Sequence, residues 1–171
     1  MTTSEALSFL QAHQPMPDDD ALNAHPEILQ KYEEVRKYFV ENPDPRCIEL
    51  FLNSFGERSG FGIYQLVDEV FFNLDARVVT KALRNNLTRA ASLSTYTLYW
   101  NVELCMTFPD SSFLEHLEKI INHPNSDVRI SVAGALGQIK DERVATILKK
   151  QIAVEDDTDV IETLKEVLDE L

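Results

Sequence analysis

The amino-acid sequence predicts an all-α protein, an α-solenoid of about four helix pairs preceded by an N-terminal helical cap. Apolar residues recur at three- and four-residue spacing along most of the chain, which is typical of amphipathic helices. Only five glycines occur in 171 residues, and sandwiches or nucleotide-binding α/β folds usually need more turn glycines. Four segments begin alike at intervals of about 32 residues, the period of a repeat built from two helices.

The first 43 residues are expected to form the cap. A helix is predicted from Ser4 to His13, followed by a loop at PMPDDD (15–20), where two prolines and three adjacent like charges disfavour a helix. A second helix is predicted over 26–41, because its apolar residues fall on one face. The NPDP sequence at 42–45 ends it.

Four helix pairs are predicted after the cap. The opening segments are DPRCIELFL from Asp44, DARVVTKAL from Asp75, DSSFLEHLEK from Asp110 and DERVATILKK from Asp141. Each aspartate can cap a helix by accepting hydrogen bonds from the first-turn N–H groups. The second helices are expected at 61–73, 93–107, 125–138 and 157–170. The repeats therefore span 44–74, 75–109, 110–140 and 141–171, stacked with the cap (1–43) into one compact domain.

The third repeat contains the most specific motif, HPNSDVRISVAGALGQIKD at 123–141. The motif consists of a proline before the helix, Asp-Val-Arg at its start, small residues in the middle and Leu-Gly near its end. The matching residues are Pro124, Asp127, Val128, Arg129, Ala133, Ala135, Leu136 and Gly137. This pattern resembles a HEAT repeat of the phycobilisome-lyase-like type. Asp159 and Val160 continue it 32 residues later, where Ile161 replaces the arginine. The resemblance covers 110–171 and is weak before that.

The charge of the chain is strongly negative, with a formal net charge of −13. This argues against binding to nucleic acid and to anionic membranes, because phosphate contacts come from Lys and Arg. An acidic surface attracts basic partners. The N-terminus has no basic, apolar leader and no stretch is long enough to span a bilayer, so a cytoplasmic location is expected.

No arrangement of side chains predicts catalysis, a cofactor or a metal site. His116 and His123 lack further ligands at metal-binding spacing. FGERSGFG (55–62) lacks the Lys-Ser/Thr of a phosphate-binding loop and is interpreted as a break between helices. Cys47 and Cys105 are expected to be reduced core thiols. The acidic runs 18–20 and 155–157 are interpreted as solvated loops. Ser92, Ser94 and Thr95 are candidate helix caps.

The predicted binding surface lies on the outward faces of the second helices. Leu98, Val102 and Cys105 share one helix face and match the core positions Ile63, Val67 and Val70. The opposite face then exposes Tyr96, Trp100 and Glu103, although these rings could instead pack on neighbouring repeats. The same register turns outward Asp68, Glu69 and Phe72 in the first repeat and Glu162 and Glu166 in the fourth. In HEAT-like stacks the second helices line the concave surface, so these residues would form one acidic groove.

These features favour a protein-binding module over an enzyme. A small, acidic, helical-repeat chain resembles, by type and composition, bacterial immunity proteins that neutralise a toxin by direct binding. Such toxins are often basic nucleases, and an acidic groove would complement them. The alternatives are a HEAT-like lyase or chaperone, because some lyase-type repeat proteins handle a bilin, and a general assembly adaptor. A HEAT-like DNA glycosylase would need a basic groove.

Overall fold

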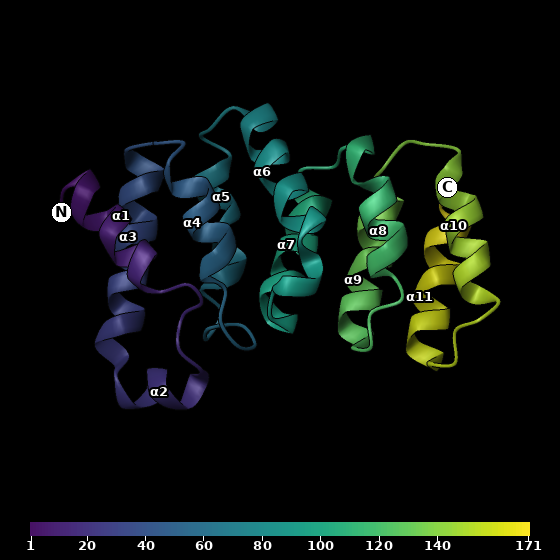
Figure 1. The fold of residues 1–171 in the computed structure, drawn as a ribbon, viewed down its shortest axis with the longest axis horizontal. Helices are drawn as coiled ribbons and strands as arrows, with labels where there is room; N and C mark the ends of the chain where they lie inside the picture. Colours follow the sequence, from purple (N-terminus) through teal and green to yellow (C-terminus); the bar gives the residue numbers. More distant parts are fainter. The chain divides into compact units, whose positions relative to one another are not determined.

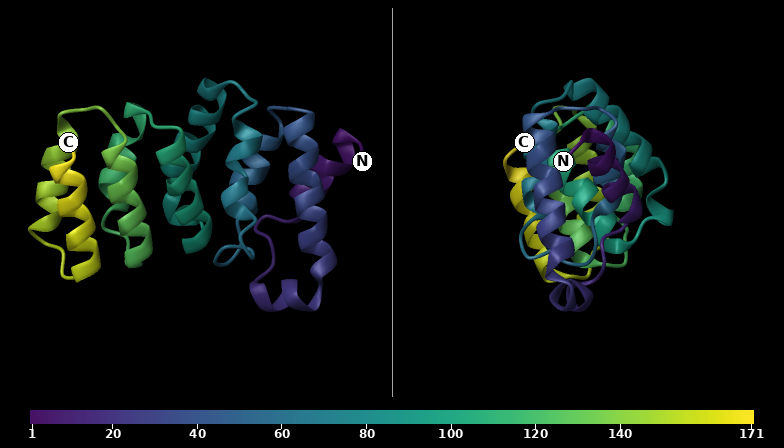
Figure 2. Two further views of the ribbon diagram at one scale, coloured as in Figure 1. Left: turned by 180° about the vertical axis from the view of Figure 1, so that it is seen from behind. Right: turned by 90° about the vertical axis from the view of Figure 1, so that its left-hand side faces the viewer.

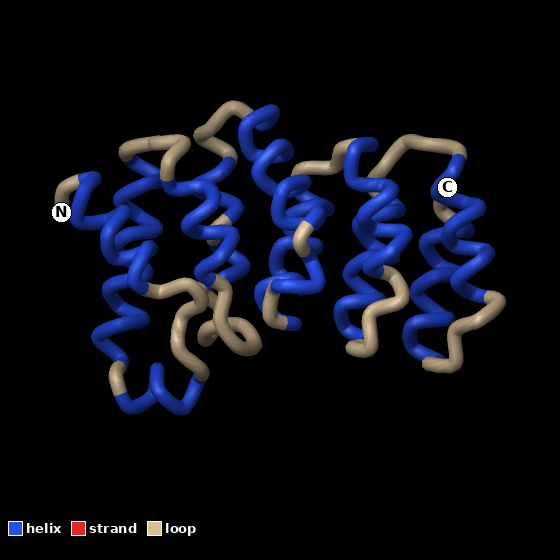
Figure 3. The backbone as a smooth tube through the Cα atoms, in the orientation of Figure 1, coloured by secondary structure: helices blue, strands red, loops and turns tan.

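The computed structural model describes residues 1–171 and contains only helices, turns and loops (Figures 1 and 3). The chain forms eleven α-helices and three short 3₁₀ helices, and no strand occurs. The all-α prediction is confirmed.

The chain divides into two compact units, residues 1–82 and 83–171, which are described separately below. Helix α6 (Ala76–Thr88) contains the division. The repeat borders predicted from the sequence period lie at 43/44, 74/75, 109/110 and 140/141. The division into two compact units does not test these borders, and they stay predictions.

The first unit is built around interlocking aromatic rings. Its helices before α6 are α1 (Thr3–Ala12), α2 (Asp19–Ala24), α3 (Pro26–Glu41), α4 (Cys47–Ser54) and the one-turn α5 (Asp68–Phe71), with 3₁₀ helix η1 at Tyr64–Leu66. The rings that meet edge to face are Tyr32, Phe39, Phe51, Phe55, Tyr64 and Phe71. Such pairs add about 0.5–1.5 kcal/mol each beyond the apolar area they bury. The Tyr32 and Ser54 hydroxyls hydrogen-bond at 2.8 Å inside this core.

Two local expectations for the first unit were wrong. The loop expected at 15–20 ends early, because the Asp18 carboxylate accepts from the Ala21 N–H at 2.8 Å and caps α2, which begins at Asp19. Acidic residues are favourable in a first helical turn, so the aspartate run starts a helix here instead of preventing one. The helix expected over 61–73 is instead a turn, η1 and the single turn α5.

The expected break at FGERSGFG is confirmed, and its backbone conformation explains why no helix runs through these residues. Arg58, Gly60, Phe61 and Gly62 all have positive φ, with values of 51°, 52°, 54° and 89°. A left-handed conformation costs roughly 1–2 kcal/mol for a residue with a Cβ. A segment with positive φ at four positions cannot form a right-handed helix.

Gly60 and Gly62 allow a matched test of packing in this break. A Cβ at Gly60 would lie 2.6 Å from the Tyr64 ring, whereas a Cβ at Gly62 meets only the Gln65 side-chain amide at 3.4 Å. We expect Gly60→Ala to lower the free energy of unfolding by about 1–3 kcal/mol more than Gly62→Ala, which is the usual cost of overpacking. Urea denaturation of both variants measures the difference. Equal losses would mean that only backbone strain matters at Gly60.

The second unit contains regular helix pairs. After the C-terminal part of α6 come η2 (Ala90–Ser92), α7 (Thr95–Thr107), η3 (Ser111–Phe113), α8 (Leu114–Ile120), α9 (Ser126–Gly137), α10 (Arg143–Ile152) and α11 (Thr158–Asp169). Helices α8 and α9, and likewise α10 and α11, pack as pairs, as Figure 1 and the left view of Figure 2 show. The predicted core positions Leu98, Val102 and Cys105 are buried, as are Ile63, Val67 and Val70 in the first unit.

The four repeat-opening aspartates each accept a local hydrogen bond close to where the first helix of a pair begins, although Asp44 and Asp141 lie before the N-cap residues of α4 and α10. Each carboxylate accepts from the backbone N–H two residues later, at 2.8–3.0 Å, in the pairs Asp44–Arg46, Asp75–Arg77, Asp110–Ser112 and Asp141–Arg143. In three of the pairs the arginine side chain also returns to the carboxylate. Hydrogen bonding from Arg143 lowers the pKa of Asp141 to about 2. The motif thus starts the first helix of each pair.

Candidate functional site

Helices α7, α9 and α11 begin with equivalent caps, and this fixes their relative register. Ser94, Asn125 and Asp157 each accept from a backbone N–H in the first turn of the helix that follows. The caps are 31 and 32 residues apart, which matches the period of the repeats. Positions counted from these caps are therefore structurally equivalent along the three helices.

The three helices pack directly on one another, α7 on α9 and α9 on α11. The Ser131 hydroxyl of α9 donates to the Glu103 carboxylate of α7 at 2.5 Å. Close approach depends on two glycines of α9. A Cβ at Gly134 would lie 2.8 Å from the Met106 sulfur, and one at Gly137 would lie 2.7 Å from a Val167 methyl carbon.

Three rows of partly or fully exposed residues cross these helices at equivalent positions. The second helical position has Tyr96, Asp127 and Asp159, the fifth has Tyr99, Ile130 and Glu162, and the ninth has Glu103, Gly134 and Glu166. We call these nine residues the acidic face. It contains five carboxylates and two tyrosines but no Lys or Arg. Its charge is therefore uncompensated by side chains within the face.

Tyr99 is the member of the acidic face that the sequence analysis missed. Its side chain is half-buried, and burial together with the nearby Glu103 carboxylate raises the pKa of its phenol. Its ring packs edge to face on Trp100, with centroids 5.3 Å apart. Counting helix positions from the Ser94 cap would have identified Tyr99, because it falls at the position of the exposed Glu162 in α11.

The predicted partner-binding residues fall on both units. Tyr96, Trp100 and Glu103 are half-buried, and Glu162 and Glu166 are exposed in the second unit. Trp100 occupies the helix position at which α9 has the buried Ser131, so it lies at the edge of the acidic face rather than within it. In the first unit Phe72 is 61% exposed. These assignments stay predictions.

The acids predicted in the first unit have different environments. Burial raises the pKa of Asp68, which is half-exposed. Glu69 is exposed, but its carboxylate accepts from the buried Arg36 guanidinium, which also pairs with Glu33. Glu69 thus helps to neutralise a buried charge and has less freedom to bind a partner than Glu162 or Glu166.

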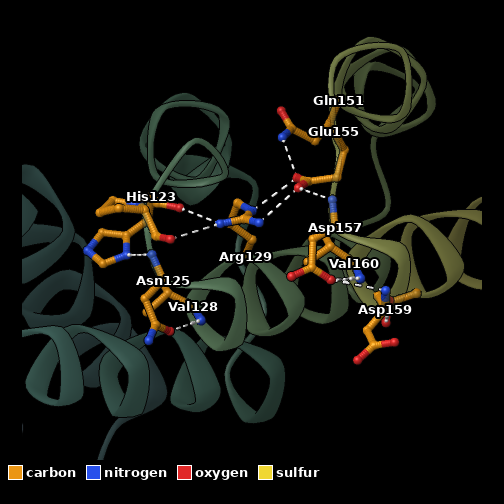
Figure 4. A network of polar contacts seen from close by, with 11 residues as sticks. His123, Asn125, Val128, Arg129, Gln151, Glu155, Asp157, Asp159 and Val160 are labelled. Carbon is orange, nitrogen blue, oxygen red and sulfur yellow. Dashed lines mark hydrogen bonds and ion pairs between the residues drawn. The ribbon is translucent and has the colours of Figure 1, made fainter.

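A largely buried ion pair connects the first turns of α9 to the loop that precedes α11 (Figure 4). The Arg129 guanidinium donates to both Glu155 carboxylate oxygens, at 3.0 and 2.8 Å, and to the carbonyls of His123 and Pro124. Glu155 also accepts from the Gln151 side chain and the Asp157 N–H. Burial alone would raise the pKa of Glu155, but these hydrogen bonds outweigh it and lower the pKa.

This pair corrects the interpretation of 155–157 as a solvated loop. The Glu155 side chain is only 3% exposed, whereas Asp156 is exposed and Asp157 caps α11. The sequence signal for this ion pair was the arginine of the Asp-Val-Arg motif, because its guanidinium needs hydrogen-bond acceptors. Its partner is 26 residues away and only the packed repeats bring the two together.

The remaining titratable groups form no cluster that could hold a metal ion. No three His, Cys, Asp or Glu side chains lie close enough to hold a metal ion. Both cysteines are free and buried, as predicted, and burial raises the pKa of Cys47 to about 12. None of the helices is sufficiently long and apolar to cross a membrane.

The fold and its repeated caps define an α-solenoid of helix pairs. A protein-family profile described as HEAT repeats matches residues 80–169, which is 90 of the 171 residues. The chain belongs to the HEAT-repeat family, whose repeats serve as protein-interaction or scaffold modules. Comparison with curated proteins and comparison with solved structures each find no match.

Proposed function

We propose that this protein acts by binding a basic protein partner through the acidic face of α7, α9 and α11, rather than by catalysis. The observation that carries the proposal is the composition of this face, which has five carboxylates, two tyrosines and no basic side chain. Carboxylates steer a basic partner into contact, and tyrosines supply large, rigid contact area. The helices beneath are fixed by caps and close packing, so the face is held in one geometry before binding.

We further propose that the partner is a nuclease-type bacterial toxin and that the protein is its immunity protein. Nucleases that act on phosphate backbones are commonly basic where they meet nucleic acid. A rigid acidic surface is complementary to such a site and competes with nucleic acid for it. The proposal rests on this complementarity and on the interaction role of HEAT repeats.

The first test compares two variants with the same charge change. The face variant combines Asp127→Asn, Asp159→Asn, Glu162→Gln and Glu166→Gln. The control variant combines Glu49→Gln, Glu57→Gln, Glu115→Gln and Glu142→Gln, four exposed acids outside the face. We expect wild type and control, but not the face variant, to capture the same basic protein from a lysate of the source cells, identified by mass spectrometry. Equal capture by all three would place the binding site elsewhere.

The captured protein then allows a kinetic prediction. Its association rate constant with wild type should fall by about tenfold or more as salt is raised, because steering depends on unscreened charge. The rate constant for the face variant should be low and nearly independent of salt, while the control should behave like wild type. Stopped-flow mixing measures these constants. Salt-independent association of wild type would contradict electrostatic steering.

The immunity proposal has its own readout. The captured protein alone should degrade nucleic acid and stop cell growth, and an equimolar amount of this protein should suppress both effects. The face variant should fail to protect. A partner with no toxicity or nuclease activity would contradict the immunity role and leave the binding role intact.

A further inference from the structure

A concave site lies in the second unit, among residues outside the acidic face. It is a pocket of about 420 Å³ between the C-terminal part of α6, η2 and α8. None of its lining residues belongs to the acidic face. We propose that it binds a small amphipathic carboxylic acid, with the apolar body in the pocket and the carboxylate at its rim.

The floor of the pocket is apolar. Leu87, Leu98 and Ile120 line it and are at most 7% exposed, and Leu93, Ala90 and Ala91 add further apolar lining. The two alanines keep the space open, because larger side chains there would fill it. A volume of this size and an apolar lining with a few polar groups are typical of small-molecule sites.

The rim contains hydrogen-bond donors and no acid. His116, Lys119, Asn122 and His123 line it, whereas no Asp or Glu does, although the chain has 29 acids and 16 Lys and Arg residues. The basic and acidic side chains of α8 lie on different sides of the helix. Its acids Glu115 and Glu118 lie on the other side, in a groove shared with Arg143 and Lys150. The rim is therefore locally cationic on an acidic protein.

The ring of His123 is held in a donating orientation. Its Nδ1 accepts from the Asn125 N–H at 3.1 Å, so in the neutral ring the proton is on Nε2. Nε2 is then a hydrogen-bond donor. Lys119 adds an ammonium group that makes no ion pair with an acid of the chain. A carboxylate accepts from such donors through strong charge-assisted hydrogen bonds, which a cation or an alcohol of the same length cannot form as well.

The test uses octanoate as the probe, with octyltrimethylammonium as the matched cation. In ¹H–¹⁵N NMR spectra of the full chain, octanoate should shift saturably the amides of 87–98 and 116–123, and the cation should not. His116→Gln with Lys119→Gln should weaken octanoate binding about tenfold or more, given 1.5–3 kcal/mol for hydrogen bonds to charged groups. Lys149→Gln, an exposed lysine outside the pocket, should leave the affinity unchanged.

Ala91→Leu tests the apolar part of the site. Ala91 is exposed at the pocket, so the larger side chain should fill the space without disturbing the core, and octanoate binding should be lost while the melting temperature is kept. The proposal is overturned if octanoate shifts no pocket amides, if the cation binds equally well, or if Ala91→Leu binds octanoate like wild type. These measurements need no protein partner, so their outcome is independent of the proposed function.

Discussion

Replacement of Arg129 by methionine is expected to lower the free energy of unfolding by about 3–5 kcal/mol, the cost of removing one partner of a buried ion pair. Methionine keeps much of the apolar stem of the side chain but removes the charge. Glu155 would then retain a carboxylate that is only 3% exposed and has lost its two strongest donors. The His123 and Pro124 carbonyls would also lose the guanidinium. Chemical denaturation followed by circular dichroism measures the loss.

The matched control is Arg143→Met. Arg143 pairs with Asp141 at 2.8 Å, but its side chain is 59% exposed. Exposed pairs contribute about 0–1 kcal/mol, so this variant should remain close to wild type. Adding Glu155→Gln to Arg129→Met should recover part of the loss, because no uncompensated charge stays buried. Similar losses in Arg129→Met and Arg143→Met would show that burial does not strengthen the role of Arg129.

The same pair predicts a dependence of stability on pH. The pKa of Glu155 is lower in the folded protein than its ordinary value of 4.5. Its contribution to stability is therefore fully present above that ordinary value and is lost as pH falls through the lowered pKa. The double variant Arg129→Met/Glu155→Gln should lose less stability than wild type over this acidic range. Denaturation curves at a series of pH values provide the comparison.

Leu136→Ala is expected to lower the free energy of unfolding by about 2–5 kcal/mol, the usual cost of a large-to-small change in a core. Leu136 is fully buried, and Val132 and Ile139 of the same segment are buried with it. The loss combines the transfer free energy of the missing methyl groups with the cavity left between packed helices. Leu171→Ala removes the same groups from a side chain that is 58% exposed and should change stability by less than about 0.5 kcal/mol. An unchanged melting temperature for Leu136→Ala would contradict the observed packing.

Several features of this protein could be predicted from the sequence because they depend on residues close together in the chain. The opening aspartates bond to N–H groups two residues away, and the Ser94 cap of α7 is equally local. Core positions such as Leu98 and Val102 followed from helical spacing alone. The break at 55–62 was also predicted, and its glycines at 60 and 62 adopt positive φ, a conformation that few other residues adopt readily.

Other features were decided by tertiary packing. The Glu155 carboxylate is buried because α9 and α11 pack together and bring Arg129 to it across 26 residues. The outward direction on α7 depends on which side meets α9, and this selects Tyr99 for the acidic face and leaves Trp100 at its edge. A helical wheel gives the relative angles of side chains but not the position of neighbouring helices. Local sequence therefore predicted most of the helices and their repeat, while contacts between repeats decided which charges are buried and which remain available to a partner.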